Sequence, residues 1–200
     1  NYKKKIPIIL LTKGLSIVDN ELSTLSDKIK NLLEKEGHSE INISAIKGPC
    51  LAAGLANKMR TGTVIANKNL KESQYLKEII STNYYSIEIS EDINGVELSG
   101  AIKNIYSMLI GASEGLSNPK ATKEIQSKYF LNTAASLIHR SISEMVEFVS
   151  NYGGKAETVY GLAGLGDLYV SAIGGRNSLM GKYLGEGYLY NEIGRASCRE

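Results

Sequence analysis

The first ninety residues alternate between short apolar runs and stretches in which apolar positions recur at helical spacing. The runs are typical of strands covered on both faces, and they lie at 6–12, 43–46, 63–66 and 84–89. Between them, apolar residues three and four positions apart predict helices over about 22–33, 49–59 and 70–81. We expect Asp19 or Asn20 to cap the first helix and Gly37 to end it, with Pro49 in the first turn of the second. This alternation predicts a layered α/β unit.

From residue 91 onward the pattern is helical. Helices are expected over about 96–115, 132–151 and 157–160, and a further helix begins at Arg176. The second of these carries one apolar stripe, made of Leu131, Ala135, Ile138, Ile142, Met145 and Val149. Between 161 and 166 we expect a glycine-rich bend that presents Asp167. The prediction is an α/β part followed by an all-α part, with the boundary near residue 91.

Both ends of the sequence are unusual. The chain begins at Asn1 and enters a strand-like run almost at once, and its last eight residues resemble the translation of a sequencing adaptor. We therefore expect a chain truncated at both ends. Its native parts would be residues 1–90 and 91–192, followed by a non-native tail over 193–200.

Composition excludes several classes of function. The net charge is +2 and no basic tract gathers on one stretch, which argues against a nucleic-acid binder. Two cysteines, Cys50 and Cys198, imply no disulfide framework. The longest apolar run, 6–11, is too short to span a bilayer and lacks the flanks of a secretory signal, so we expect a cytoplasmic protein without membrane insertion. No metal-ligand spacing is present, and we expect no metal site.

Three lysines have positions that suggest chemistry. Lys13 and Lys47 each follow a predicted strand, where ligands gather in open α/β sheets, although a surface lysine before a turn glycine is the plainer explanation. Lys103, followed by Asn104, falls within a helix among apolar neighbours. Desolvation there would lower its pKa toward the range in which an amine exchanges protons near neutrality. A lysine that extends its head into water fits the same pattern.

The segment from 161 to 177 predicts an anion site. Gly175 precedes the helix that starts at Arg176 and Asn177, and a helix start offers unpaired N–H donors while arginine suits phosphate oxygens. Asp167 would orient the ammonium of Lys103, or it serves only as a turn-forming aspartate. Read together, these residues predict half of an active site for a small phosphorylated substrate. Cys50 as a nucleophile is disfavoured, because neither histidine has the pattern of a paired base.

At this point the sequence resembles a known family. The motifs at 13–14, 48–49, 100–104, 132–145 and 161–177 occur in the order found in the cytosolic, NAD(P)-dependent glycerol-3-phosphate dehydrogenases. The resemblance covers nearly everything from 6 to about 187. It implies the C-terminal part of a Rossmann-type dinucleotide-binding domain followed by a helical substrate domain. It also implies hydride transfer between a nicotinamide cofactor, NAD or NADP, and C2 of glycerol 3-phosphate or dihydroxyacetone phosphate, which supplies glycerol phosphate for phospholipid synthesis.

The resemblance also assigns roles to residues of this chain. Lys103 matches the proton donor and acceptor at the C2 oxygen, Lys13 a contact of substrate and cofactor, and Asp167 the carboxylate that holds the lysine and substrate hydroxyls. The remaining matches to substrate-binding positions are Gly48, Cys50, Asn104, Gly175, Arg176 and Asn177. Ala52 matches a cofactor contact, and Arg176 is expected to serve the cofactor as well. A homodimer is an additional expectation.

Three departures stand beside the resemblance. Position 50 is cysteine where many members carry serine or threonine, and the loop from Asp167 to Arg176 is short. The sequence also lacks the Gly-x-Gly-x-x-Gly turn that binds pyrophosphate, so residues 1–200 alone should bind dinucleotide poorly. Two other functions stay open. One is a dehydrogenase acting on a β-hydroxyacid, and the other is a non-catalytic module that binds phosphometabolites or mediates interactions.

Overall fold

A mixed four-stranded sheet and a group of long helices make up the structure, a computed structural model that describes residues 6–117 and 123–193. The strands are β1 (Ile8–Leu10), β2 (Leu15–Val18), β3 (Glu21–Thr24), β4 (Ile43–Lys47), β5 (Thr61–Ala66) and β6 (Tyr85–Ser90). The helices of the first half are α1 (Leu25–Lys35), α2 (Ala52–Ala56) and α3 (Leu70–Ile80). The second half has α4 (Ile93–Leu116), α5 (Lys123–Asn151), α6 (Ala156–Tyr160), the π-helix η1 (Leu162–Gly166), α7 (Asp167–Gly174) and α8 (Arg176–Gly185).

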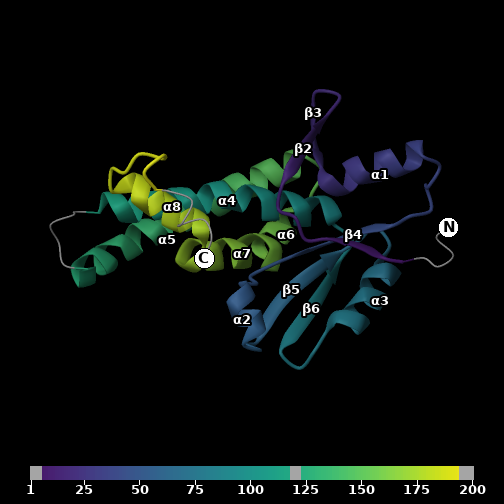
Figure 1. Cartoon of the computed structure of the whole chain (residues 1–200), viewed down its shortest axis with the longest axis horizontal. Coiled ribbons are helices and arrows are strands. Elements are labelled where there is room, and N and C mark those ends of the chain that lie inside the picture. The colour runs from purple at the N-terminus through teal and green to yellow at the C-terminus, as the bar shows by residue number, and fades with distance from the viewer. Residues whose placement is uncertain (1–5, 118–122, 194–200) are drawn as a thin grey trace.

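The sheet places the C-terminal ends of β1 and β4 side by side. Its strand order is β1-β4-β5-β6, with β1 parallel to β4, β4 antiparallel to β5, and β5 parallel to β6. Because β1 and β4 are parallel, their last residues, Leu10 and Lys47, lie at the same end of the sheet. Figure 1 shows the sheet at one side of the molecule and the long helices α4 and α5 extending away from it. The predicted α/β part followed by a helical part is confirmed.

The buried carboxylate of Asp92 fastens the start of α4 to the second half of the chain. It caps α4 by accepting from the backbone N–H of Gly95 at 2.9 Å. The same carboxylate accepts from the backbone N–H of Lys155 at 2.8 Å and from the hydroxyl of Thr158 at 2.6 Å, next to and within α6. One side chain thereby satisfies three donors and fixes α6 against α4, which positions the π-helix that follows.

Helices α4 and α8 cross with their backbones in contact, because glycines face each other on both. A Cβ atom added to Gly111 would lie 1.9 Å from the carbonyl oxygen of Ser178, and one added to Gly181 would lie 1.9 Å from that of Met108. One turn further along, Gly115 and Gly185 are similarly close to the partner helix. Only glycine leaves room for such an approach. The start of α8 is therefore held at a fixed position along the axis of α4.

The region around Asp19 and Asn20 differs from the expected helix cap. Both residues have positive φ, of 51° and 65°, and they form the turn of the hairpin between β2 and β3. Aspartate and asparagine tolerate this conformation, and two-residue hairpin turns require it. The true cap of α1 is Thr24, whose side chain accepts from the backbone N–H of Asp27. Gly37 follows the end of α1 as expected, with φ of 83°.

Other boundaries also differ from expectation. Pro49 lies before α2 instead of in its first turn, since the cap of α2 is Leu51, and the helix ends at Ala56 instead of near 59. Helix α5 begins at Lys123, nine residues before the predicted start, and Leu131 and Ala135 of the predicted stripe are exposed. The glycine-rich bend is a π-helix that leads directly into α7, so Asp167 is a helical residue. The predicted tail lies outside the described residues except for its first member.

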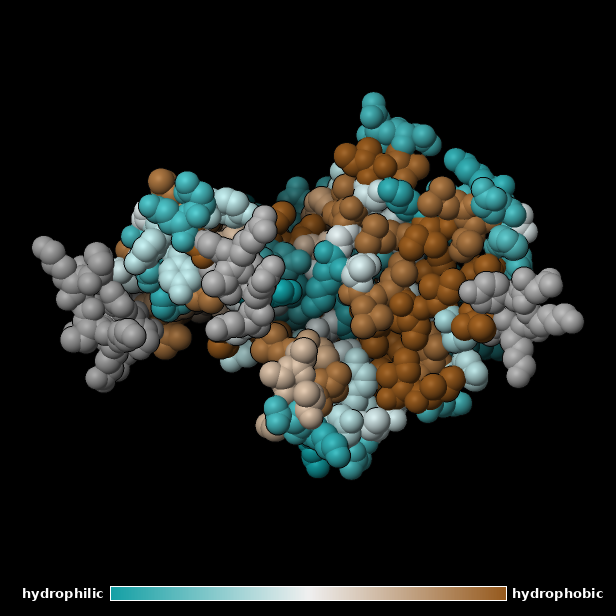
Figure 2. All heavy atoms as spheres, viewed as in Figure 1, coloured by the Kyte–Doolittle hydropathy of each residue, from teal (hydrophilic) through white to brown (hydrophobic). Residues whose placement is uncertain are grey.

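One face of the sheet region is apolar and open. Figure 2 shows hydrophobic residues gathered over the part of the molecule where Figure 1 places the strands. Exposed hydrophobic side chains from the first ninety residues include Ile6, Leu11, Leu32 and Ile79. Exposed apolar patches of this kind mark surfaces that bind something else. Within residues 6–117 and 123–193, no helix combines the length and the hydropathy needed to cross a membrane.

The contact between α4 and α8 predicts a sharp effect of a single methyl group. Gly111→Ala is expected to lower the free energy of unfolding by about 1–3 kcal/mol, because the new Cβ has no space beside Ser178. Gly54→Ala in α2 is the matched control, since nothing lies within 4 Å of its Cβ position, and alanine there should be neutral or stabilising by about 0.5–1 kcal/mol. Urea denaturation measures both. Equal stability of the two variants would contradict the close helix crossing.

Candidate active site

The π-helix sets the position of Asp167. A Cβ atom on Gly164 would lie 2.1 Å from the carbonyl oxygen of Val159, so glycine allows η1 to press against α6. A Cβ atom on Gly166 would lie 3.4 Å from the ring of Pro49, in the loop that follows β4. Helix α7 then begins with Asp167, which is 1% exposed. The fold thus places a carboxylate in the interior, between the sheet edge and α4.

Two lysines from distant parts of the chain share this carboxylate. Lys13, which follows β1, donates to Oδ2 of Asp167 at 2.6 Å, and Lys103 of α4 donates to Oδ1 at 2.7 Å. The side chain of Lys13 is 31% exposed, whereas that of Lys103 is 4% exposed. The ion-paired group is therefore closed on the side of Lys103 and open to solvent on the side of Lys13.

Ser171 completes the surroundings of Lys103. It lies one turn after Asp167 on α7, and its hydroxyl contacts the ammonium of Lys103. The hydroxyl also lies 3.5 Å from Oδ1 of Asp167, to which it donates. The ammonium thus has a carboxylate and a hydroxyl as partners on α7, both buried. These two contacts fix where the amine points.

Burial lowers the pKa of Lys103 to about 8, since the charged form of an amine is poorly solvated there. The carboxylate of Asp167 opposes this effect, and the positive charge of Lys13 adds to it. An amine with a pKa near 8 gives up and recovers a proton within the physiological range, unlike an exposed lysine. Lys103 is therefore suited to proton transfer.

The loop after β4 lies beside this group. Gly48 is buried with φ of 141°, and a Cβ there would come within 3.0 Å of the backbone of Thr63, so the position requires glycine. Cys50 is half-buried, and burial raises the pKa of its thiol while the charges of Lys13 and Asp167 also act on it. The raised pKa argues against a reactive thiolate. Cys50 is thus a neutral neighbour of the lysine–aspartate group.

Helix α8 starts next to Ser171. The backbone N–H of Gly175, the residue before α8, donates to the carbonyl oxygen of Ser171 at 3.0 Å. Arg176 is exposed and Asn177 half-buried in the first turn of α8. The helix start therefore comes within a few residues of the lysine–aspartate group. The N–H groups of that first turn and the guanidinium suit an anion.

The positions of three predicted site residues do not by themselves connect them to the lysine–aspartate group. Asn104 is half-buried next to Lys103 on α4, and its carbonyl oxygen accepts from Ser107. Ala52 is exposed as the first residue of α2, and Gly48 shapes the loop rather than presenting a side chain. Their assignments remain predictions. The structure brings together Lys13, Lys103 and Asp167, the set predicted to be catalytic.

The sequence does not predict Ser171 as a site residue, and it marks Lys47 only by its place after a predicted strand, without a specific role. Ser171 is four residues after Asp167, a spacing that signals a shared helix face, but the sequence predicts a loop from Asp167 to Arg176 where the structure has α7. Lys47 is the last residue of β4 and is 2% exposed. Burial lowers its pKa, the charge of Lys13 lowers it further, and that of Asp167 raises it. Its position at the end of a strand was the available signal.

The arrangement combines a proton carrier with positive charge. Lys13 and Lys103 carry two positive charges against the single negative charge of Asp167, so the open side of this group favours an anion. A carbonyl or hydroxyl oxygen that reaches Lys103 could exchange a proton with it. Acid–base chemistry on an oxygen of a small anion is what this site supports.

Comparisons with known proteins agree. The sequence model of the family described as NAD-dependent glycerol-3-phosphate dehydrogenase C-terminus matches residues 92–199. An NADP(+)-dependent glycerol-3-phosphate dehydrogenase of Archaeoglobus fulgidus is 35% identical over 191 residues, which are 96% of this chain and 54% of that protein. A glycerol-3-phosphate dehydrogenase [NAD(P)+] of Geobacter sp. strain M21 is 31% identical over 188 residues, 93% of this chain and 52% of that protein.

A solved structure extends the likeness to the fold. The crystal structure of glycerol-3-phosphate dehydrogenase from Coxiella burnetii matches with a TM-score of 0.79 and 31% identity, over 99% of this chain and 56% of that one. The chain thus spans about half the length of the curated relatives it matches. The family model covers more than half of the chain, including the helices that carry Lys103 and Asp167. The chain therefore belongs to the family of NAD-dependent glycerol-3-phosphate dehydrogenases.

Proposed function

We propose that this chain carries the catalytic group of an oxidoreductase that interconverts sn-glycerol 3-phosphate and dihydroxyacetone phosphate with NAD or NADP. The observation that carries the proposal is the buried amine of Lys103, held by Asp167 and Ser171 and with a pKa of about 8. Reduction of a ketone needs a proton donor at its oxygen, and oxidation of the alcohol needs an acceptor there. Lys103 does both.

Lys13 and Asp167 prepare the site for this transfer. Asp167 orients the ammonium of Lys103 through the 2.7 Å contact and offers its other oxygen to Lys13. Lys13, on the open side, stabilises negative charge that develops on the C2 oxygen as the hydride leaves or arrives. Since the positive groups are fixed before substrate binds, little reorganisation accompanies the reaction.

The start of α8 is proposed to hold the phosphate. Arg176 and Asn177 lie in its first turn, and Gly175 connects that turn to Ser171 through a backbone hydrogen bond. A phosphate bound there gains from the helix N–H groups and from the guanidinium fork. The same attachment sets the distance between the phosphate end of the substrate and Lys103. We place Cys50 and Gly48 beside the substrate on the opposite loop, and Asn104 next to Lys103.

The cofactor is proposed to bind at the open side. A nicotinamide ring bound there supplies or accepts the hydride at C2. Lys13 and Ala52 lie on the sheet side of the group, and Lys13 is partly exposed, which leaves room for the ring. Residues 1–200 contain no Gly-x-Gly-x-x-Gly turn, so their own residues do not fit the pyrophosphate.

Residues 1–90 are proposed to be part of a dinucleotide-binding domain, and residues 91–192 to be the substrate domain. The apolar sheet face and the edge position of β1 support this division, since both are surfaces on which further strands and helices can pack. The protein is proposed to act in the cytoplasm as a homodimer, supplying glycerol phosphate for phospholipid synthesis.

The proposal predicts different kinetic effects at the two ends of the substrate. In the protein as its gene encodes it in full, Lys103→Ala should lower kcat for reduction of dihydroxyacetone phosphate by about 10²–10⁴, the usual contribution of a general acid. Arg176→Ala should chiefly raise KM, by about tenfold to a hundredfold, because it removes charge-assisted hydrogen bonds to the phosphate. Absorbance of the reduced nicotinamide follows both.

Lys71→Ala is the matched control, since Lys71 is an exposed lysine on α3. Its kinetic constants should equal those of the unaltered protein. Absence of any oxidation of NADH or NADPH by the unaltered protein would overturn the assignment as a dehydrogenase, and the binding module would take its place. A Lys103→Ala variant with full kcat would remove Lys103 from the proposed mechanism.

A further inference from the structure

Lys47 is a buried lysine that the proposed mechanism does not use. It is the last residue of β4 and is 2% exposed. Its stem lies across Gly100 of α4, where a Cβ atom would come within 2.8 Å of Cδ, 3.1 Å of Cγ and 3.3 Å of Cε of Lys47. All three nearest atoms belong to this one side chain. Glycine at position 100 therefore leaves the space along which the lysine stem runs.

The ammonium of Lys47 ends at β1. It donates to the carbonyl oxygen of Leu10 at 3.2 Å. Leu10 is the last residue of β1, and the paired register of β1 with β4 ends there, opposite Ala45. The bond from Lys47 thus continues the connection between the two strands beyond the end of their ladder. Lys13 follows Leu10 by three residues in the sequence.

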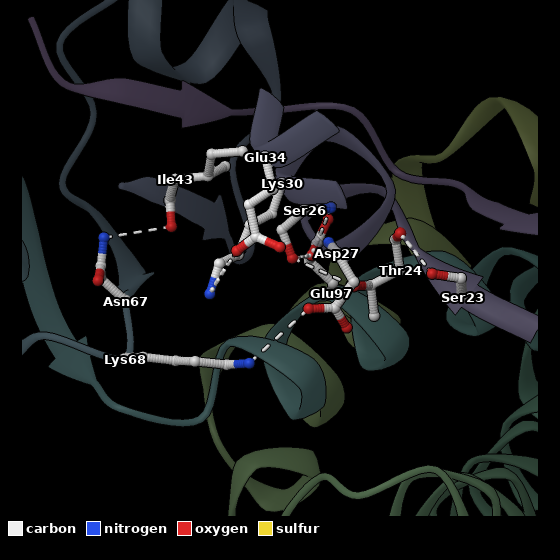
Figure 3. Close-up of polar contacts among 10 residues, drawn as sticks. All are labelled: Ser23, Thr24, Ser26, Asp27, Lys30, Glu34, Ile43, Asn67, Lys68 and Glu97. Atoms are coloured by element: carbon white, nitrogen blue, oxygen red, sulfur yellow. Dashed lines mark hydrogen bonds and ion pairs between the residues drawn. The ribbon is translucent and has the colours of Figure 1, made fainter. Parts of the chain in front are cut away.

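Charged groups surround this ammonium. Burial lowers the pKa of Lys47 to about 8, the carboxylates of Glu97 and Asp167 oppose that effect, and the charge of Lys13 adds to it. Glu97 is itself 1% exposed and is fixed by Ser26, whose backbone N–H donates to Oε2 at 3.2 Å (Figure 3). Its other oxygen, Oε1, has no hydrogen-bond partner among the described residues. Lys47 therefore lies between a fixed carboxylate and the lysine–aspartate group.

We propose that Lys47 is a positioning residue, which holds the end of β1 through the Leu10 carbonyl and thereby keeps the ammonium of Lys13 on the carboxylate of Asp167. An ordinary strand end would leave the two residues between Leu10 and Lys13 free to turn away from the sheet. Lys13 is partly exposed and reaches Asp167 with the end of its side chain at 2.6 Å, so its position depends on how the chain leaves β1. The inference rests on the proposed function for the role given to Lys13.

The test measures the proton affinity of Lys103, meaning the equilibrium constant with which its amine binds a proton in solution. The positive charge of Lys13 lowers this constant. In the full chain, without substrate or cofactor, Lys47→Met keeps the apolar stem and removes the ammonium. If Lys13 then moves off Asp167, the proton affinity of Lys103 should rise by about tenfold, as expected when a like charge leaves a buried amine. Isotope-labelled lysine observed by NMR across a pH titration measures this value.

A double-mutant cycle separates positioning from direct electrostatics. In the Lys13→Ala background, Lys47→Met should leave the proton affinity of Lys103 unchanged, because the group through which Lys47 acts is already gone. An equal rise in both backgrounds would mean that Lys47 acts on Lys103 by its own charge and would overturn the proposal. No rise in either background would overturn it as well. Lys182→Met, which removes a lysine paired with Glu114 at the far end of α4, is the control and should shift nothing.

A second variant decides the matter if Lys47→Met does not fold. Gly100→Ala keeps the charge of Lys47 but pushes its stem, so it should raise the proton affinity of Lys103 in the same direction. An unchanged value would overturn the proposal. Kinetics then separate the two levels of inference. If the NMR cycle gives the expected result while kcat/KM is unaffected by Lys47→Met, positioning stands and the role proposed for Lys13 in the reaction fails.

Discussion

The carboxylate of Asp167 is the one group on which the rest of the site depends. It accepts from Lys13, 154 residues before it, and from Lys103, 64 residues before it, at 2.6 Å and 2.7 Å. Removing it would leave the buried ammonium of Lys103 without its carboxylate partner and beside the positive charge of Lys13, which costs far more than an exposed ion pair contributes. The sheet edge, α4 and α7 therefore have to meet at this point, and each has a local reason to do so.

Backbone contacts made possible by glycine provide that reason. Gly164 lets the π-helix press on α6, and Gly111 with Gly181 lets α8 lie directly on α4. Side chains in those places would push the helices apart by ångströms, and proton transfer tolerates little displacement. The distances between Asp167 and the two lysines are thus set by contacts that involve none of these three residues. Asp92 adds a polar counterpart by fixing α6 to the start of α4.

Much of this arrangement could be predicted from the sequence. Lys103 and Asp167 are correctly brought together because a lysine among apolar residues and an aspartate after a glycine run are unusual, and because the family resemblance places them. The order of an α/β part and a helical part is also correct. The prediction for Asp19 and Asn20 is wrong because the same residue types favour a helix cap and a hairpin turn, and only the pairing of β2 with β3 decides between them.

The remaining errors have a common origin in long-range packing. A π-helix has no simple sequence signature, and glycines at 161, 164 and 166 indicate a bend unless the close approach to Val159 is known. The role of Ser171 depends on α7, the helix that follows the π-helix and carries both Asp167 and Ser171. The burial of Lys47 follows from the absence of a side chain at Gly100, fifty-three positions away, which no local pattern reveals.

The central claim is that Lys103 carries the proton, and the pH dependence of kcat/KM in both directions tests it most directly. Burial lowers its pKa to about 8, so the charged donor is lost as pH rises through 8 and the neutral acceptor is gained. Reduction of dihydroxyacetone phosphate should therefore slow about tenfold per pH unit above 8. Oxidation of glycerol 3-phosphate should accelerate up to about pH 8 and then level off. Profiles that stay flat between about pH 7 and 9.5, or change only above about 10 as for an exposed lysine, would contradict the account.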